Sequence, residues 1–450
     1  MNDVTRRFGR GPAAPNASSN ASLGPVLPPA MTPDPPARAR PIRTGPFGVL
    51  DVGSTKVCCM IGRVDPDGGL RITGFGLVAA KGVRGGGITD LDEAERTVRK
   101  AVAAAEDMAQ HHLRSVTVNL GCGHPESRQI NLQWPVGGRP VTEQDLRRIL
   151  QEGRARAVME GRETIHVLPL AFAVDETPGV ADPRGLHCEL LMARLHTVDT
   201  GATALRNLVT TIERCELDVA ELVSAPMAAG IAVLVEDERQ LGATVIDMGG
   251  GTTDLAVFSE GHVIHTAQLP VGGGHVTNDI ARLLSTPVAH AERLKTLYGN
   301  AEGSPDDERE MLPVPLVGEE EHQIHRVPRS QVVNIIRPRL EETFELVRDR
   351  LEGAGLARQA GNRVVLTGGA SQLVGAREMA ARILDRQVRV GRPLNVRGLP
   401  ERQDGPQYAT AAGLLAWAAG QGRTFPEIDP LDDAAPGLMR RVINFLRDRV

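Results

Sequence analysis

Two segments of the chain, 49–56 and 245–254, share one local pattern. VLDVGSTK and VIDMGGGTTD each place an aspartate after two apolar residues and follow it with a short run of glycine and hydroxyl residues. Each segment predicts a strand that ends at its aspartate and turns through a loop whose backbone N–H groups converge on one point. Because the same pattern returns in the middle of the chain, the sequence indicates a duplicated lobe.

Loops of this kind suit a phosphate ligand, since small residues let an anion approach the backbone. At the strand ends, Asp51 and Asp247 are the candidate ligands for a hydrated Mg²⁺, and Lys56 can add a positive charge toward the phosphates. Two ordinary β-turns would explain either loop alone. A third glycine turn, LTGGA at 366–370, favours the phosphate interpretation for the set.

Composition excludes several classes of protein. The 51 Lys and Arg residues against 56 Asp and Glu give a net charge of -5, and only 3% of residues are aromatic, so we expect no nucleic-acid partner. Five cysteines without a C-x-x-C spacing indicate thiols in a reducing compartment rather than disulfides or a zinc site. Residues 1–46 carry ten prolines and no apolar stretch typical of a secretory signal, and no segment is long and apolar enough to span a bilayer.

Several stretches resemble one superfamily, the actin and heat-shock chaperone ATPases with their sugar-kinase relatives. The similarity is closest to the bacterial cell-division family FtsA and covers roughly 47–450. It rests on these stretches in order: DVGSTKV, GGGITDLDEAERTV, ETIHVLPLAFAVDE, ERCELDVAELVSAP, EDERQLGATVIDMGGGTTDLAVF, PVGGGHVTNDIARLLSTPVAHAERLKTLYG, VVLTGGASQLVGAREMAARI and ATAAGLLAWA.

The resemblance implies an α/β, two-lobed actin-like ATPase fold with duplicated β-sheet and helix subdomains and an inserted small α+β subdomain. The expected ranges are an unstructured Pro/Arg-rich tail at 1–46, the first lobe's large subdomain at 47–123 and 201–238, the inserted subdomain at 124–200, the second lobe's large subdomain at 239–277 and 356–403, its smaller subdomain at 278–355, a helix returning to the first lobe at 404–420, a linker at 421–436 and an amphipathic helix at 437–450.

The resemblance also implies ATP and Mg²⁺ as ligands and assigns four groups of residues to them. The first phosphate loop looks like Gly53, Ser54, Thr55 and Lys56, and the second like Gly249, Gly250, Gly251, Thr252 and Thr253. Glu292 and Lys295 look like the helix that reaches the ribose and base, although a solvated i,i+3 ion pair explains them as well. The adenosine turn looks like Gly368, Gly369 and Ser371.

One position departs from the chaperone pattern. Heat-shock chaperones have a glutamate before the proline of the inter-lobe segment that helps to order the attacking water, and here Ala225 precedes Pro226. A proton acceptor for hydrolysis is therefore not evident, so we expect a nucleotide that sets the angle between lobes and is hydrolysed slowly.

The last 14 residues, 437–450, form an amphipathic pattern. At 100° per residue, one arc of roughly 160° collects most of the apolar side chains, and four arginines lie mainly on the other face. The pattern predicts a helix lying on an anionic membrane surface, although docking on the protein itself is the alternative. Its membrane-facing side chains are Leu438, Met439, Val442, Ile443, Phe445 and Leu446.

The family resemblance implies a peripheral protein on the inner face of the cytoplasmic membrane at the division site. It would tether filaments of the division tubulin FtsZ, recruit later division proteins and self-associate into filaments. Family members bind the FtsZ tail in the region of 278–355, where Arg326, Arg329, Arg337 and Arg339 are candidate cations. The alternatives are a sugar or acid kinase on the same ATPase core and a chaperone-type ATPase, which would need a further peptide-binding domain.

Overall fold

In a computed structural model of the chain, residues 45–319, 324–356, 358–394, 396–400 and 404–421 are described. They all fall within one unit, Arg38–Val450. The predicted tail as far as residue 44, nearly all of the predicted linker and the predicted helix at 437–450 lie outside the described residues.

The first sheet has six strands in the order β11-β6-β1-β2-β3-β19. Strands β1, β2 and β3 form an antiparallel meander, and β6 and β11 extend it in parallel. The turn between β2 and β3 falls at 65–69, where the segment DPDGG separates two runs of β-forming residues. The strands are β1 (Phe47–Val52), β2 (Lys56–Val64), β3 (Leu70–Ala79), β6 (Ser115–Leu120), β11 (Asp218–Ser224) and β19 (Val396–Arg397).

The second sheet repeats this arrangement in five strands, β14-β13-β12-β17-β18. Its first three strands are an antiparallel meander and its last two are added in parallel, as in the first sheet. The duplication that the two similar segments predict is therefore present in the strand order. The strands are β12 (Ala243–Met248), β13 (Thr253–Ser259), β14 (His262–Leu269), β17 (Arg363–Thr367) and β18 (Gln387–Val390).

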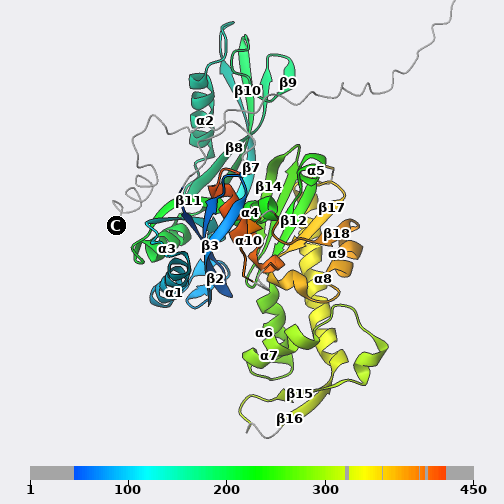
Figure 1. Cartoon of the computed structure of the whole chain (residues 1–450). Helices are drawn as coiled ribbons and strands as arrows, with labels where there is room; N and C mark the ends of the chain where they lie inside the picture. Colours follow the sequence, from blue (N-terminus) through cyan, green and yellow to red (C-terminus); the bar gives the residue numbers. More distant parts are fainter. Residues whose placement is uncertain (1–44, 320–323, 357, 395, 401–403, 422–450) are drawn as a thin grey trace, which may run out of the picture. The chain divides into compact units, whose positions relative to one another are not determined.

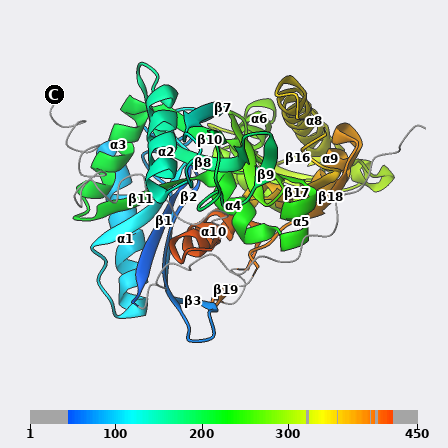
Figure 2. The same cartoon turned by 90° about the horizontal axis from the view of Figure 1, so that it is seen from above.

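Two apolar helices, α4 (Ala225–Val233) and α10 (Ala409–Ala418), pack together between the two sheets (Figures 1 and 2). Their buried side chains share one cluster with Val49 and Met60 of the first sheet and with Val245 and Phe258 of the second. Neither helix has a polar stripe, because both of its sides are covered. The two sheets are therefore joined through a continuous apolar core.

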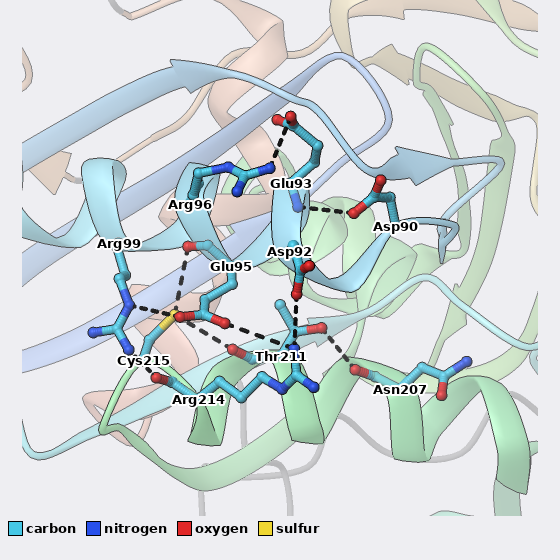
Figure 3. A network of polar contacts seen from close by, with 10 residues as sticks. All are labelled: Asp90, Asp92, Glu93, Glu95, Arg96, Arg99, Asn207, Thr211, Arg214 and Cys215. Carbon is cyan, nitrogen blue, oxygen red and sulfur yellow. Dashed lines mark hydrogen bonds and ion pairs between the residues drawn. The ribbon is translucent and has the colours of Figure 1, made fainter.

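The outer face of the first sheet is covered by α1 (Leu91–Ala109) and α3 (Ala202–Glu213). Asp90 caps α1, as expected for an aspartate that precedes an apolar helical pattern. The buried face of α1 consists of Ala94, Thr97, Val98, Ala101, Val102 and Ala105, and Leu91 is half-buried. Exposed ion pairs join α1 to Arg214 at the end of α3 (Figure 3): Arg214 lies 3.1 Å from the Asp92 carboxylate and 3.8 Å from that of Glu95. Such exposed pairs contribute little stability.

The insertion between β6 and α3 is a four-stranded sheet, β7-β10-β8-β9, with one helix on its face. Thr142 and Asp145 form a capping box at the start of this helix, a signal that local sequence carries. The β-forming run ETIHVLPLAFAVD at 163–175 predicts the strand that follows the helix, whereas no such run predicts the two long strands at the insertion's borders. The elements are β7 (Glu126–Pro135), α2 (Glu143–Ala157), β8 (Arg162–Val174), β9 (Thr177–Val180) and β10 (Leu190–Gly201).

Four helices enclose the outer core of the second sheet: α6 (Gly273–Leu283), α7 (Val288–Tyr298), α8 (Arg329–Gly353) and α9 (Ala376–Leu384). The short helix α5 (Glu236–Leu241) contacts β13 and has no buried residue. Residues 301–326 are acidic and weakly periodic, which predicts a loop or an irregular strand pair. The structure has a strand pair there, β15 (Met311–Pro315) with β16 (Ile324–Pro328). A short pair, β4 (Val83–Arg84) and β5 (Gly87–Ile88), precedes α1.

Among the described residues, the helices are each too short or too polar to cross a bilayer. Four of the five cysteines are buried free thiols, as predicted, while Cys215 is partly exposed and donates weakly to the Thr211 carbonyl at 3.3 Å. The sheets and helices thus position two similar loops, and these loops define the candidate site.

Candidate functional site

A cavity of about 520 Å³ lies between the two loops that follow β1 and β12. It is lined by fourteen of the sixteen residues that the sequence assigns to nucleotide: Asp51, Gly53, Ser54, Thr55, Lys56, Asp247, Gly249, Gly250, Gly251, Thr252, Glu292, Lys295, Gly368 and Gly369. Four segments that are far apart in the sequence therefore meet at one cavity. The volume is within the range of small-molecule sites.

Both loops make the same turn. In the first, the Gly53 N–H donates to the Lys56 carbonyl at 3.0 Å, and in the second, the Gly249 N–H donates to the Thr252 carbonyl at 2.9 Å. A Cβ added to either glycine would lie 3.0 Å from that same carbonyl oxygen. The sequence pattern that the two segments share thus corresponds to the same backbone turn in both loops.

The two loops touch at their tips. A Cβ on Gly250 would lie 2.2 Å from the Thr55 side chain, and one on Gly251 would lie 2.5 Å from the Ser54 hydroxyl oxygen. The Ser54 hydroxyl also accepts the Gly86 N–H at 3.0 Å. Gly250 and Gly251 are therefore required because the side chains of the first loop leave no room for a Cβ, whether or not a ligand is bound.

Three buried carboxyl groups lie in the cavity. Burial raises the pKa of Asp51, which Lys56 opposes with its ammonium 3.9 Å away. Burial also raises the pKa of Asp247, while a hydrogen bond from the Thr410 hydroxyl at 2.6 Å acts against it. Because acidic groups without enough positive charge around them favour a cation, this donor set fits Mg²⁺.

Asp254 is the third carboxyl group, and the sequence interpretation did not assign it a role. It accepts hydrogen bonds from the Thr252 hydroxyl and from the Gln268 amide, each at 2.9 Å. Burial, followed by the nearby Asp247 carboxyl, raises the pKa of Asp254 to about 7. The sequence carried a signal for it, because Asp254 is the last residue of the repeated segment VIDMGGGTTD.

The N-terminus of helix α6 lies against the second loop. The N–H groups of Gly273 and Gly274 donate to the carbonyls of Gly249 and Gly250 at 2.9 and 2.8 Å, and both glycines line the cavity. In the sequence, the glycine run in GGGHV at 272–276 was the feature that could have indicated these two cavity residues. A helix N-terminus that faces a cavity adds favourable partial charge for an anion.

Glu292 and Lys295 of α7 line the same cavity on the far side of α6. The Lys295 ammonium lies 2.7 Å from the Glu292 carboxylate and donates to the Thr277 hydroxyl at 2.9 Å and to the Gly273 carbonyl at 3.1 Å. The pair is thus part of the junction of α6 with α7, and it is also exposed to the cavity.

Two assigned residues do not line the cavity. Thr253 is buried in β13 and donates to the Val271 carbonyl at 2.7 Å, and Ser371 is buried and donates to the Gly368 carbonyl at 2.7 Å. Ser371 therefore shapes the third turn from behind. Gly368 has a φ of 82°, and a Cβ there would lie 2.3 Å from Asp247, so this position requires glycine.

The four candidate arginines of the smaller subdomain differ in their surroundings. Arg339 pairs with Asp279 at 2.6 Å, Arg329 with Glu310 at 3.0 Å and Arg337 with Glu341 at 3.0 Å. Arg326 is exposed on β16 and has no ion pair within the described part of the chain. Arg326 is therefore the arginine most available to an acidic partner.

Comparison with known proteins identifies the relatives of this chain. A family model described as cell division protein FtsA matches residues 244–413, and one described as the SHS2 domain inserted in FTSA matches residues 122–199. The cell division protein FtsA of Agrobacterium fabrum is 43% identical over 380 residues, 82% of this chain and 86% of that protein. That of Escherichia coli K12 is 35% identical, with coverage of 81% and 88%.

The chain belongs to the FtsA family of cell division proteins. The resemblance inferred from the motifs is thereby confirmed, and so is the role in cell division at this level. The FtsA inserted domain coincides with the β7–β10 sheet and its helix α2.

Solved structures show the same fold. The PilM-PilN type IV pilus biogenesis complex superposes with a TM-score of 0.59 at 17% identity, covering 83% of this chain and 98% of that one. MreB5 of Spiroplasma citri bound to ADP superposes with a TM-score of 0.50 at 14% identity, covering 82% and 95%. The predicted α/β actin-like ATPase fold with an inserted subdomain is therefore confirmed for this FtsA-family chain.

Proposed function

We propose that this FtsA-family protein binds ATP with Mg²⁺ in the cavity between its two loops. The observation that carries the proposal is that two loops with the same turn meet at a cavity that is lined by three buried carboxyl groups. Asp51 and Asp247 would hold the hydrated ion, and the loop N–H groups with Lys56 would hold the phosphates. The family's structural neighbour MreB5 is solved with ADP, which agrees with this assignment.

Titration of the purified protein with a non-hydrolysable ATP analogue tests the site. Binding should require Mg²⁺ and should weaken in Lys56→Ala and in Asp247→Ala, because each substitution removes a charge aimed at the phosphates or the ion. Unchanged affinity in both variants would refute the site assignment.

Hydrolysis should be slow. Ala225 lines the cavity at the start of α4, where the chaperones carry a glutamate, so the side chain that would order water is missing. Asp254 is the described carboxyl group that could replace it, although hydrogen bonds engage both of its oxygens. A turnover of several per second by the monomer would show that a proton acceptor operates in this site.

Residues 437–450 are proposed as the membrane-targeting helix. As 14 residues are marginal for a helix in water, they should fold as their apolar arc enters an anionic bilayer. Phe445→Glu with Leu446→Glu should release the protein from anionic vesicles, whereas Arg447→Lys keeps the charge and should change little. Full vesicle binding by the double variant would contradict the proposal.

The proposed cellular role is a tether between FtsZ filaments and the membrane, which also recruits later division proteins and self-associates. A fluorescent fusion should form a mid-cell ring, and removal of residues 437–450 should disperse it. Arg326→Glu should lower co-sedimentation with FtsZ filaments more than Arg339→Glu, because Arg339 is already neutralised by Asp279 and Glu342. Equal binding by Arg326→Glu and the parent would place the FtsZ surface elsewhere.

A further inference from the structure

Strand β14 is the edge strand of the second sheet, and its free edge faces the inserted subdomain. Two side chains of β7 cap this edge. The Ser127 hydroxyl accepts the Thr266 N–H at 2.9 Å, and the Gln129 amide donates to the Ile264 carbonyl at 3.0 Å. The inserted subdomain, which the chain attaches to the first lobe, is thus also hydrogen-bonded to the second (Figure 1).

The same strand reaches the nucleotide cavity two residues later. The Gln268 amide donates to the Asp254 carboxyl group and to the Gly121 carbonyl, each at 2.9 Å. Asp254 and Gly121 both line the cavity. Gly121 also lies in the connection from β6 to β7, so Gln268 contacts the cavity wall and the entry to the insertion together.

The contact between β14 and the insertion, which we call the β14 seam, also contains buried polar atoms without hydrogen-bond partners among the described residues. His196 of β10 is fully buried, and neither of its ring nitrogens has a partner among the described residues. The Nε2 atom of His265 is likewise buried without a partner in the described chain, while its Nδ1 lies 3.1 Å from the Ser127 hydroxyl.

Burial, together with His166 and His265, lowers the pKa of His196 to about 3. Buried polar atoms without partners cost free energy, and in a well-packed core nearly all of them are satisfied. The β14 seam is therefore less stable than the apolar core around α4 and α10. Elements of low local stability are the ones that rearrange when a ligand binds.

We propose that β14 couples the nucleotide cavity to the inserted subdomain, with Gln268, Ser127 and Gln129 as its positioning residues. A nucleotide that changes the surroundings of Asp254 shifts the Gln268 amide, and with it the position of the β14 edge relative to Ser127 and Gln129. The inserted subdomain then responds to nucleotide through the second lobe, besides its covalent link to the first. This inference rests on the nucleotide site proposed above.

Coupling of this kind is reciprocal, so changes at the seam must alter nucleotide affinity. In the structure, the hydrogen bonds of the β14 seam and the open nucleotide cavity are present in the same conformation. Loss of the seam hydrogen bonds therefore disfavours the conformation that holds the ligand. We expect Ser127→Ala with Gln129→Ala to weaken binding of the ATP analogue about fivefold, although neither residue lines the cavity.

The experiment combines titration with amide hydrogen exchange on the purified full chain, using the ATP analogue with Mg²⁺. In the parent protein, nucleotide should slow exchange in β7 and β14. In the Ser127→Ala/Gln129→Ala variant, and in Gln268→Ala at saturating nucleotide, the β7 response should disappear. Gln133→Ala is the matched control, because Gln133 is an exposed glutamine of the same strand beyond the seam.

The outcomes separate the two proposals. Weakened affinity together with loss of the β7 response, and a normal Gln133→Ala variant, supports the coupling. If the parent binds nucleotide and the seam variants show the same affinity and the same β7 response, the coupling is refuted and the nucleotide site stands. If the parent binds no nucleotide, the proposed site fails and the coupling fails with it.

Discussion

The two phosphate loops have the same turn and opposite chemistry. The first loop, 53–56, carries the side chains of Ser54, Thr55 and Lys56, while the matching turn of the second, 249–252, has glycine at 250 and 251 and a side chain only at Thr252. Because Thr55 and Ser54 occupy the space that a side chain at position 250 or 251 would need, only one of the two loops can carry side chains at its tip. A duplicated loop can face its copy closely because the copies have diverged in a complementary way.

The two aspartates differ in a similar manner. Asp51 faces Lys56 across 3.9 Å, whereas Asp247 accepts a hydrogen bond from Thr410 of α10, the helix between the sheets. One carboxyl group is thus balanced from within its own loop, and the other is oriented by a distant segment. This asymmetry has measurable consequences.

The largest expected effect is at Asp247. Asp247→Ala should weaken Mg²⁺-dependent binding of the ATP analogue by roughly a hundredfold, because it removes a proposed metal carboxyl group that is fixed in place. Asp51→Ala removes a similar charge but frees Lys56 to reach the phosphates, so its loss should be smaller. Repeating both titrations in EDTA should erase the difference, and a larger loss in Asp51→Ala would reverse the proposed asymmetry.

The next effect is on the contact between the loops. Gly250→Ala places a Cβ 2.2 Å from Thr55 and should separate the loops, with a cost of about 1–3 kcal/mol and a loss of about tenfold in nucleotide affinity. Gly87→Ala is the matched control, because its nearest neighbour would lie at 3.7 Å. Restoration of binding by the pair Gly250→Ala/Thr55→Ser would show that the clash is the cause.

Much of this arrangement was predictable from local sequence. The repeated sequence pattern predicts the two loops, and the capping residues predict where α1 and α2 start. Both signals depend only on a few neighbouring residues. The third glycine turn was also found, although the role of Ser371 behind it was not. A hydroxyl residue in a turn does not reveal whether it faces a cavity or its own backbone.

The rest depends on tertiary contacts. Strands β7 and β10 were missed because their sequences, ESRQINLQWP and LLMARLHTVDTG, are mixtures of polar and apolar residues without strict alternation. Asn119 was also missed, and its side chain accepts the Val52 N–H at 2.8 Å beside the first loop. Such cross-strand partners have no short-range signal, because they lie 67 residues apart.

A smaller effect should appear in the pH dependence of stability. The pKa of Asp254 is about 7 in the folded chain against an ordinary value of 3.8, so between these limits the folded state binds more protons than the unfolded state. The free energy of unfolding of nucleotide-free protein should therefore lose up to about 1.4 kcal/mol per pH unit from this group as pH rises from about 4 to 7. Asp254→Asn should remove that contribution, as measured by denaturant unfolding across this range. Parallel pH profiles for the two proteins would mean that Asp254 titrates normally.

The smallest effect tests the equivalence of the two turns. In Gly53→Ala and Gly249→Ala the new Cβ lies 3.0 Å from the carbonyl oxygen that closes the turn, which is tight but not prohibitive. Because the geometry is the same, each variant should lose about 1 kcal/mol of stability, and the two losses should agree within a few tenths of a kcal/mol. Thermal unfolding of both variants beside the parent measures this directly. A clear difference between the two losses would show that the loops have the same backbone turn but differ in how easily the turn adjusts to a Cβ. The loop with the larger loss would then be the one with the more rigid surroundings. The second loop is the expected candidate in that case, since α6 and the Gly368 turn both pack against it, while the first loop has Lys56 exposed to the cavity.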